Sequence, residues 1–374
     1  MAHIHITLVG GQPTPVYQGV VLSQPDKIIL ICSAGEHGTE KLALSIQEKL
    51  HELHFFSVMI EKIVTNNVHV ITQKLGLIFS TITSDDTLSI NVSGGVRVWS
   101  VLCYKLCPYH TAHIYCISQN GEVLTLQGEC NSEKVKFDIF TQFVLLGNPL
   151  EHYNSFADYS DEERNNHDII SKYYSNESFR KKLKLFQKKY AEDNSFLDND
   201  QEVGNETHYI YWFSTDRVFQ IGWGEQIEEI TGKFAIPMLL NTAWYEYEIA
   251  SILAQIYGPE NVYTNCVFKL KDSNEDKNEV DIIVNTGQKL LFVECKTRID
   301  KITDIDKFHS VVKNYGGNGS KALFVTMQPI DQIRQEKCKD NHINHCFTHQ
   351  QNNKQINPQQ LKQVIQEFID FQNY

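Results

Sequence analysis

The alternation of apolar and polar positions divides the chain into three regions. Over residues 1–150, short apolar runs that suit buried strands alternate with segments whose apolar residues recur at helical spacing. The run KIILICSA, for example, precedes a segment with apolar residues three or four apart, at Leu42, Ile46, Leu50 and Leu53. Such alternation predicts a mainly parallel, doubly wound sheet. Ligands bind sheets of this kind at the carboxyl ends of the strands.

Residues 151–232 have a different pattern. Two polar and strongly charged segments, 160–174 and 177–194, have helical periodicity, and the aromatic-rich segment 208–224 suits a small hairpin. The acidic, weakly apolar stretch 191–207 predicts a loop. We therefore interpret this region as a mixed connector module.

A second α/β pattern follows over residues 233–374. It begins with a long apolar helix at 236–258 and ends with a helix at 358–373. Between these helices the pattern predicts one further helix and four strands, at 302–317 and at 262–270, 279–287, 289–297 and 321–328. The chain is thus expected to be an α/β protein in three parts, 1–150, 151–232 and 233–374.

Composition narrows the class of protein. A chain of 374 residues is longer than a single hydrophobic core usually supports, which agrees with two domains and a connector. No apolar run has the length of a membrane helix, and the first residues lack the pattern of a secretion signal. We therefore expect a cytoplasmic protein with no membrane contact. The nine cysteines include no C-x-x-C pair, which favours buried thiols over zinc ligands or disulfides.

The formal net charge of −12 argues against a surface coated in basic residues. Contact with nucleic acid would then depend on localised basic patches. One candidate is the segment FRKKLKLFQKK, residues 179–189, which interleaves six basic residues with apolar ones. Its pattern fits a solvated amphipathic helix, or alternatively a face that contacts phosphates.

The segment EVDIIVNTGQKLLFVECK, residues 279–296, contains the most specific chemistry. Two β-rich runs flank a turn at residues 285–288, so they are expected to pair as an antiparallel hairpin. Asp281 opens the first run and Glu294 closes the second, which places the two carboxylates side by side at one end of the hairpin. Lys296 points the same way as Glu294, because side chains alternate faces along a strand.

Two carboxylates and a lysine that converge suit phosphodiester cleavage. Asp281, Glu294 and the backbone carbonyl of Cys295 offer the hard oxygen ligands that Mg²⁺ or Mn²⁺ prefers. Such an ion polarises the scissile phosphate and activates water, and Lys296 is expected to orient that water and to stabilise the developing charge. The pattern D-x₁₂-E-x-K resembles the motif of the PD-(D/E)xK nucleases, which implies a restriction-endonuclease-like α/β/α domain. The alternative is a surface hairpin with an incidental salt bridge.

The segment SINVSGGVRVWS, residues 89–100, places a Ser-Gly-Gly turn between a strand and a helix. The backbone N–H groups of Ser93, Gly94 and Gly95 favour an anion at the helix N-terminus, and Arg97 suits a phosphate bidentately. By itself, a Gly-Gly pair fits equally well a tight turn with positive φ.

This turn resembles the ligand-binding loop of CARF domains, the Rossmann-like sensors of cyclic oligoadenylates in type III CRISPR defence. Val96 stands at the usual threonine of that loop and Arg97 at its usual lysine. The segment LVGGQPTPV, residues 8–16, resembles the first strand and ligand-facing turn of the family. Gln12 and Thr14 in this turn are expected to hydrogen-bond ribose or adenine.

A CARF domain joined to a PD-(D/E)xK domain is the architecture of the CARF–restriction-endonuclease effectors, the CRISPR ancillary nucleases. Their G-G-W-x-E-x-Y helix is similar to AWYEY at residues 243–247, and this match selects Glu246 over Glu248, which pattern alone leaves equivalent. The paired glycines are replaced by Thr242 and Ala243. The resemblance implies a catalytic set of Glu246, Asp281, Glu294 and Lys296.

The same resemblance implies a metal-dependent endonuclease that cuts DNA and/or RNA and is activated by cyclic tetra-adenylate. A cyclic ligand with rotational symmetry suits a two-fold axis, so a homodimer is expected. Two alternatives from other classes stay open. One is a non-catalytic cyclic-nucleotide sensor with a retired nuclease fold, and the other is a restriction or repair nuclease that no cyclic nucleotide gates.

Overall fold

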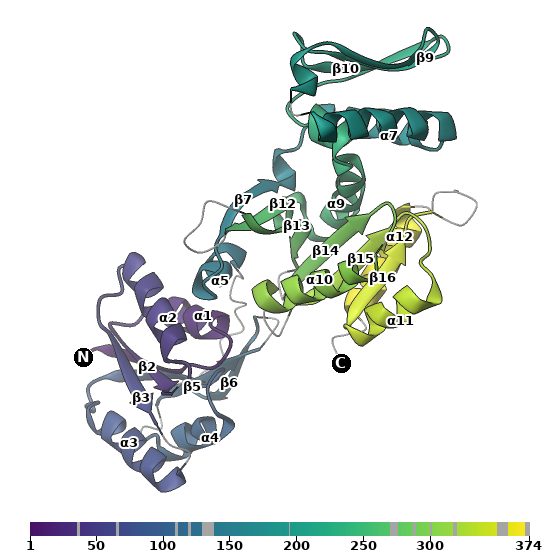
Figure 1. The fold of residues 1–374 in the computed structure, drawn as a ribbon. Helices are drawn as coiled ribbons and strands as arrows, with labels where there is room; N and C mark the ends of the chain where they lie inside the picture. Colours follow the sequence, from purple (N-terminus) through teal and green to yellow (C-terminus); the bar gives the residue numbers. More distant parts are fainter. Residues whose placement is uncertain are drawn as a thin grey trace.

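The computed structural model contains two six-stranded sheets and one four-stranded sheet within its described residues (Figure 1). These residues are 1–35, 38–64, 67–108, 111–118, 121–128, 138–193, 195–269, 276–286, 289–299, 301–316, 320–349 and 358–370. The N-terminal and C-terminal sheets lie on opposite sides of a short junction, and the small sheet lies at the end of the molecule away from the N-terminal one (Figure 1). None of the helices in the described ranges has the length and apolarity needed to cross a membrane.

The N-terminal sheet is doubly wound, as the sequence predicts. Its strand order is β3-β2-β1-β4-β5-β6, parallel except for the last pair. The strands are β1 His3–Leu8, β2 Lys27–Ser33, β3 Val58–Ile63, β4 Thr87–Asn91, β5 His113–Ile117 and β6 Val123–Gln127. The strand order reverses between β1 and β4, so the turns after these two strands flank the crevice where such folds bind ligands.

Four helices cover the two faces of this sheet. They are α1 Thr14–Ser23, α2 Glu40–Glu52, α3 Val68–Ser80 and α4 Arg97–Leu106. Buried residues of α1 and α2 share one core with β2, whereas those of α3 and α4 share another with β1, β2 and β4. Since side chains of a strand alternate between the faces, β2 contributes to both cores.

The C-terminal sheet has the order β16-β15-β14-β13-β12-β7. Its strands are β7 Leu150–Ser155, β12 Val262–Lys269, β13 Asp276–Asn285, β14 Leu290–Lys296, β15 Lys321–Thr326 and β16 Ile343–Phe347. One face packs against α9 Ala243–Tyr257 and α12 Pro358–Asp370, and the other against α5 Ile139–Leu145 and α10 Thr303–Val311. Sequence analysis did not identify β7, β16 or α11 Gln332–Asp340.

The predicted long helix at 236–258 is wrong in one respect, because it is two helices. The first is α8 Ala235–Leu240, and α9 begins at Ala243. Thr242 between them has φ of 64°, the left-handed conformation that a continuous α-helix cannot contain. The break redirects the chain so that α9 runs along the C-terminal sheet.

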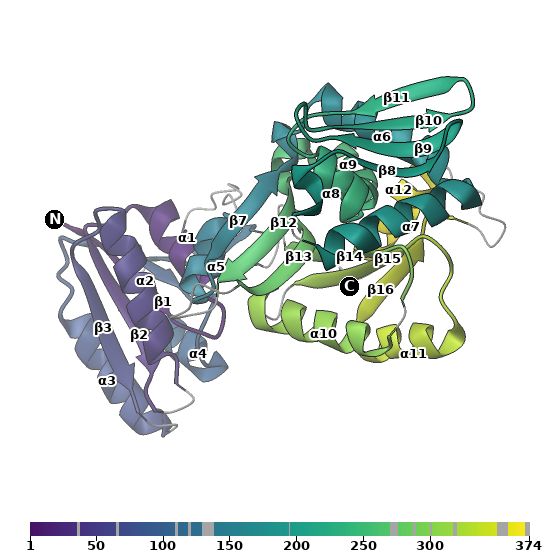
Figure 2. The same cartoon turned by 45° about the horizontal axis from the view of Figure 1, so that its top comes forward.

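The middle region, residues 151–232, packs as a further layer against the C-terminal half of the molecule. The helices α6 Asp161–Tyr174 and α7 Glu177–Glu192 pack beside the antiparallel sheet β11-β10-β9-β8 (Figure 2). Its strands are β8 Gln201–Asn205, β9 His208–Phe213, β10 Val218–Trp223 and β11 Gln226–Ile230. The predicted loop was therefore wrong at β8, where pairing with the aromatic-rich β9 stabilises a stretch of low strand propensity.

One hydrophobic core joins the middle region to the C-terminal sheet. Phe179 and Phe186 of α7 belong to the same buried cluster as Trp244 of α9 and Val293 of β14. The C-terminal sheet also includes a strand that precedes the middle region in the chain, because β7 pairs with β12. The division at residues 150 and 232 stays a prediction, and the packing joins the described middle region to one face of the C-terminal sheet.

This shared core predicts the response to one substitution. Phe186→Ala removes a fully buried ring that contacts Phe196 and Phe219, so we expect the free energy of unfolding to fall by about 3–5 kcal/mol. Leu185→Ala, at an exposed neighbouring position, should cost less than about 0.5 kcal/mol. Urea unfolding followed by tryptophan fluorescence measures both. Equal effects of the two substitutions would contradict the packing.

Candidate functional site

Asp281 and Glu294 lie at adjoining ends of the β13–β14 hairpin. The two strands pair antiparallel, with Ile282 opposite Val293, so the next position in the register sets Asp281 opposite Glu294. Gly287 and Gln288 of the predicted turn lie outside the described residues. Apolar residues on both strands are buried up to this end, which fixes the backbone beneath the two carboxylates.

Lys296 lies between the two carboxylates. Its Nζ is 2.8 Å from Oε1 of Glu294 and 3.9 Å from Oδ2 of Asp281. The same Asp281 oxygen accepts a hydrogen bond of 2.7 Å from the backbone N–H of Cys295. The structure therefore brings together the three side chains that the hairpin pattern predicted, and Cys295 holds Asp281 in place through its backbone.

Burial and like charge dominate the electrostatics of this cluster. Burial raises the pKa of Glu294 to about 7, the nearby Asp281 adds to the shift, and Lys296 opposes it. Burial also raises the pKa of Asp281, against the effects of Lys296 and the Cys295 N–H. For Lys296, burial lowers the pKa, but the two carboxylates raise it by more. The cluster thus concentrates negative charge where an added cation is favoured.

Glu246 joins this cluster from α9. Burial raises its pKa well above the ordinary value, and the charges of Asp281 and Glu279 raise it further. Glu248 has a different neighbour, since its Oε2 is 3.9 Å from Nε2 of His167 on α6. Glu246, the glutamate that the sequence resemblance selected, therefore interacts electrostatically with the cluster, and its catalytic role stays a prediction.

The chemistry of the donor set fits a hard divalent cation. Within the described ranges, no group of three or more His, Cys, Asp and Glu side chains is arranged to hold a metal ion. The predicted set instead combines the carboxylates of Asp281 and Glu294 with the backbone carbonyl of Cys295. Oxygen ligands of this kind are those that Mg²⁺ and Mn²⁺ take, and a bound cation would offset the cost that burial imposes on the ionised form of both acids.

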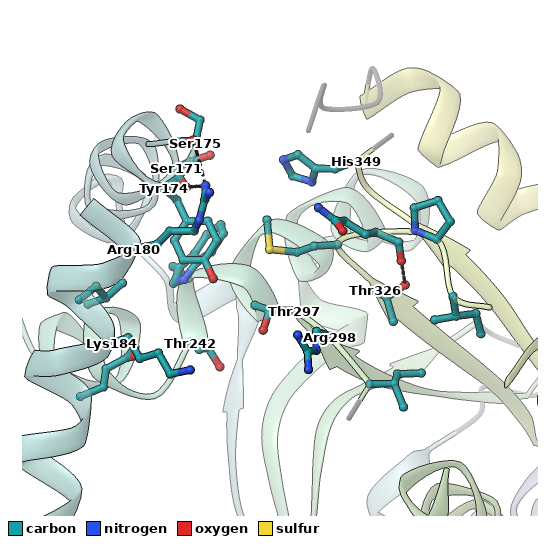
Figure 3. Close-up of a pocket in the computed structure, with 18 of the residues that line it drawn as sticks. Ser171, Tyr174, Ser175, Arg180, Lys184, Thr242, Thr297, Arg298, Thr326 and His349 are labelled. Atoms are coloured by element: carbon teal, nitrogen blue, oxygen red, sulfur yellow. Dashed lines mark hydrogen bonds between the residues drawn. The ribbon is translucent and has the colours of Figure 1, made fainter. Parts of the chain in front are cut away.

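A pocket of about 1390 Å³ adjoins the cluster. Figure 3 shows Arg180 and Lys184 on its helical side, and Thr297 and Arg298 on the facing side. Thr297 directly follows Lys296 in the chain. Arg180 and Lys184 belong to the basic segment 179–189, which the sequence analysis identified as a candidate phosphate contact. No sequence pattern predicts that α7 lies near the end of β14. Sequence analysis therefore missed Thr297 and Arg298.

The predicted sensor loop packs glycine against glycine. A Cβ on Gly94 would lie 2.3 Å from the carbonyl oxygen of Leu8 and 2.7 Å from the backbone nitrogen of Gly10. A Cβ on Gly10 would lie 2.6 Å from the nitrogen of Gly95, which itself has φ of 77°. The turns after β1 and β4 thus touch through their backbones, and this contact explains the glycines on packing grounds.

The other predicted ligand residues differ in their surroundings. The Ser93 hydroxyl donates to Oδ1 of Asn91 and accepts from the N–H of Ile117, so it is engaged within the fold. Arg97 is exposed in the first turn of α4, which has no side-chain cap at its N-terminus. Thr14 is buried where α1 begins, and Gln12 is partly exposed in the turn before it.

The contact between the two turns predicts that alanine at Gly94 destabilises the domain more than alanine at Gly11 does. Gly94→Ala should destabilise the N-terminal domain by about 1–3 kcal/mol, because its methyl group would meet backbone atoms that cannot move aside. Gly11→Ala should have little effect, because a Cβ there meets nothing within 4 Å. Thermal unfolding monitored at Trp99, which packs beside Gly95, measures the difference. Similar midpoints for the two variants would contradict it.

No family model and no curated protein matches the chain, but solved structures do. Can2 from Sulfobacillus thermosulfidooxidans in complex with cyclic tetra-adenylate is 16% identical, with a TM-score of 0.69 over 98% of this chain and 97% of Can2. Protein VC1899 from Vibrio cholerae is 16% identical, with a TM-score of 0.72 over 99% of this chain and 97% of that one.

A third similar structure is a type III CRISPR defence DNA nuclease activated by cyclic oligoadenylate. It is 14% identical, with a TM-score of 0.60 over 98% of this chain and 52% of the nuclease. At these identities the likeness shows the fold. Over almost its whole length, the chain therefore has the fold of Can2, and it shares the fold of about half of this nuclease, as its sequence resemblance predicted.

Proposed function

We propose that this protein is a metal-dependent endonuclease of the PD-(D/E)xK type, which cuts DNA and/or RNA when cyclic oligoadenylate binds its N-terminal domain. The observation that carries the proposal is the convergence of Asp281, Glu294 and Lys296 at the end of one hairpin. A non-catalytic sensor has no physical use for carboxylates that burial makes costly to ionise.

Each residue of the cluster has a distinct role in this proposal. Asp281, Glu294 and the Cys295 carbonyl hold the divalent ion, and the Cys295 N–H orients Asp281 for this task. The chemistry that Mg²⁺ or Mn²⁺ supplies when bound is polarisation of the scissile phosphate and activation of water near neutral pH. Lys296 stays protonated, positions the attacking water and stabilises charge that develops on the phosphate. Glu246 supplies a further carboxylate to the cluster.

The crevice between the turns after β1 and β4 is the proposed sensor site for cyclic tetra-adenylate. The uncapped N-terminus of α4 and the N–H groups of Gly94 and Gly95 favour its phosphates, and Arg97 adds a bidentate donor. Gln12 and Thr14 contribute from the facing turn. Support comes from the shared fold with Can2, whose structure contains cyclic tetra-adenylate.

A homodimer completes the proposed sensor, because a ligand with rotational symmetry is held evenly across a two-fold axis. Exposed apolar side chains on α3 and α4 support association through this domain. Leu77 and Val101 are 66% and 64% exposed, and Tyr104 is 50% exposed. Burial of these apolar side chains against a second copy of the chain would stabilise a dimer.

The catalytic assignment predicts how three substitutions act. Asp281→Asn, Glu294→Gln and Lys296→Gln should each slow cleavage by about 100-fold or more, since each removes a group needed in the transition state. Chelation of divalent ions with EDTA should stop cleavage, and added Mn²⁺ or Mg²⁺ should restore it. Gel assays on supercoiled DNA, single-stranded DNA and RNA, with saturating cyclic tetra-adenylate, measure these rates.

Glu202→Gln serves as the control, because this exposed glutamate lies on the separate four-stranded sheet. It should cleave at the wild-type rate. If the wild type cuts no polynucleotide under any of these conditions, the protein is a non-catalytic sensor. Full activity of the Glu294 variant would remove the hairpin from the mechanism.

The sensor assignment predicts a selective loss of activation. Arg97→Ala should raise the concentration of cyclic tetra-adenylate needed for half-maximal cleavage by about tenfold or more, because a charged hydrogen bond to phosphate is lost. Lys105→Ala, an exposed cation at the other end of α4, should leave this concentration unchanged. Titration of the cyclic nucleotide against initial cleavage rate provides the measurement. Equal cutting with and without the activator would point to a nuclease that no cyclic nucleotide gates.

A further inference from the structure

The pocket beside the catalytic cluster has features of a track for nucleic acid. We propose that it holds the strand being cut, with Lys184 and Arg298 contacting backbone phosphates on either side and Tyr174 contacting a base. This inference rests on the proposed nuclease function and extends it to the path that the substrate takes.

Position is the first argument. The pocket is lined by Thr297 and Arg298, which directly follow Lys296, and by Thr242 and Trp244 at the start of α9. Glu246 lies two residues further along that helix. The pocket therefore lies next to the catalytic cluster along two separate segments of the chain, although no cluster residue lines it, and this closeness places a bound strand near the cluster.

Charge is the second argument. The lining includes five basic residues and two acidic ones, in a chain whose formal net charge is −12, and the basic residues are Lys172, Arg180, Lys184, Arg298 and Arg334. Lys172 pairs with Glu228 outside the lining, and Arg334 pairs with Asp331. In the described part of the chain, Lys184 has no ion-pair partner. A local excess of positive charge in an acidic protein favours a polyanion at this place.

The walls of the pocket also contain a fixed guanidinium and an aromatic ring, which can contact phosphates and bases. One Nη of Arg180 donates to the backbone oxygens of Tyr174 and Ser175, at 2.7 and 2.9 Å, which fixes the guanidinium at the end of α6. Its charge stays available, because both acceptors are neutral. The partly exposed Tyr174 ring has its centroid 4.6 Å from that of Trp244 and 6.0 Å from the Arg180 guanidinium carbon. The wall thus combines an aromatic ring with a cation, the two kinds of group on which bases stack.

The size of the pocket points to an extended ligand. The volume of about 1390 Å³ exceeds the range of roughly 300–1,000 Å³ for small-molecule sites, which favours an extended ligand.

Two lysines on α7 provide a matched test. Lys184 lines the pocket, whereas Lys181 lies outside the lining and pairs with Glu177 at 2.8 Å. Lys184→Glu and Lys181→Glu change the net charge equally on the same helix. Both side chains are exposed, so neither variant should change the unfolding midpoint. Lys184→Arg keeps the charge at the pocket.

The readout is binding of labelled single-stranded DNA and RNA by the full-length protein with cyclic tetra-adenylate, in Ca²⁺ to prevent cutting, between about 50 and 200 mM salt. Lys184→Glu should raise Kd about tenfold and reduce the slope of log Kd against log salt by about one. Lys184→Arg and Lys181→Glu should stay within about twofold of the wild type. An equal loss of affinity in Lys184→Glu and Lys181→Glu would contradict the proposed track. So would an unchanged affinity in Lys184→Glu.

Cleavage by the same samples in Mg²⁺ separates this proposal from the one on which it rests. If the wild type cuts a polynucleotide but Lys184→Glu binds it normally, the nuclease assignment stands and the track is wrong. If the wild type neither binds nor cuts DNA or RNA, both are wrong, and the pocket serves a different ligand.

Discussion

The burial of several carboxylates at one place is the constraint around which the C-terminal half is organised. Burial is the largest cause that raises the pKa values of Asp281, Glu294 and Glu246, and the charge of Asp281 raises those of Glu294 and Glu246 further. Lys296 offsets part of this cost from 2.8 Å away. Such a cluster destabilises the fold unless well-packed strands hold it. The strands β13 and β14 meet this need, because Ile282, Ile283, Phe292 and Val293 are fully buried.

The features predicted correctly from the sequence are those that depend on neighbours in the chain. Asp281, Glu294 and Lys296 belong to one hairpin, so alternation of side chains and an antiparallel turn were enough to bring them together. The doubly wound N-terminal sheet followed from strand–helix alternation in the same way. The break at Thr242 was missed because a single left-handed residue leaves the apolar pattern on both sides intact.

Features that depend on contacts between segments far apart in the chain could not be predicted from the sequence. The strand β8 has a weak pattern of its own and forms because β9 lies alongside it. The pocket combines α6, α7, the start of α9 and the end of β14, and no spacing in the sequence relates these segments. For Ser93, the pattern suggested a ligand contact, but the fold engages the hydroxyl with Asn91 and Ile117. In the proposed sensor site, the Ser93 hydroxyl is therefore not a ligand contact, and the backbone N–H groups of the turn take that role.

The junction between the N-terminal and C-terminal halves is a packed helix, α5. Phe143 of α5 is buried in the core beneath the C-terminal sheet, whereas Leu145, two residues later, is buried in the core of α1 and α2. Hydrogen bonds join the segment to both sides, from Ser45 to the Leu145 oxygen and from Gln142 to the Gly316 oxygen. Because packed side chains transmit a shift better than a flexible linker does, these contacts provide a physical connection between α2 and the edge of the C-terminal sheet. For this connection to gate cleavage, the cyclic nucleotide must bind one arrangement of the two halves more tightly than the other.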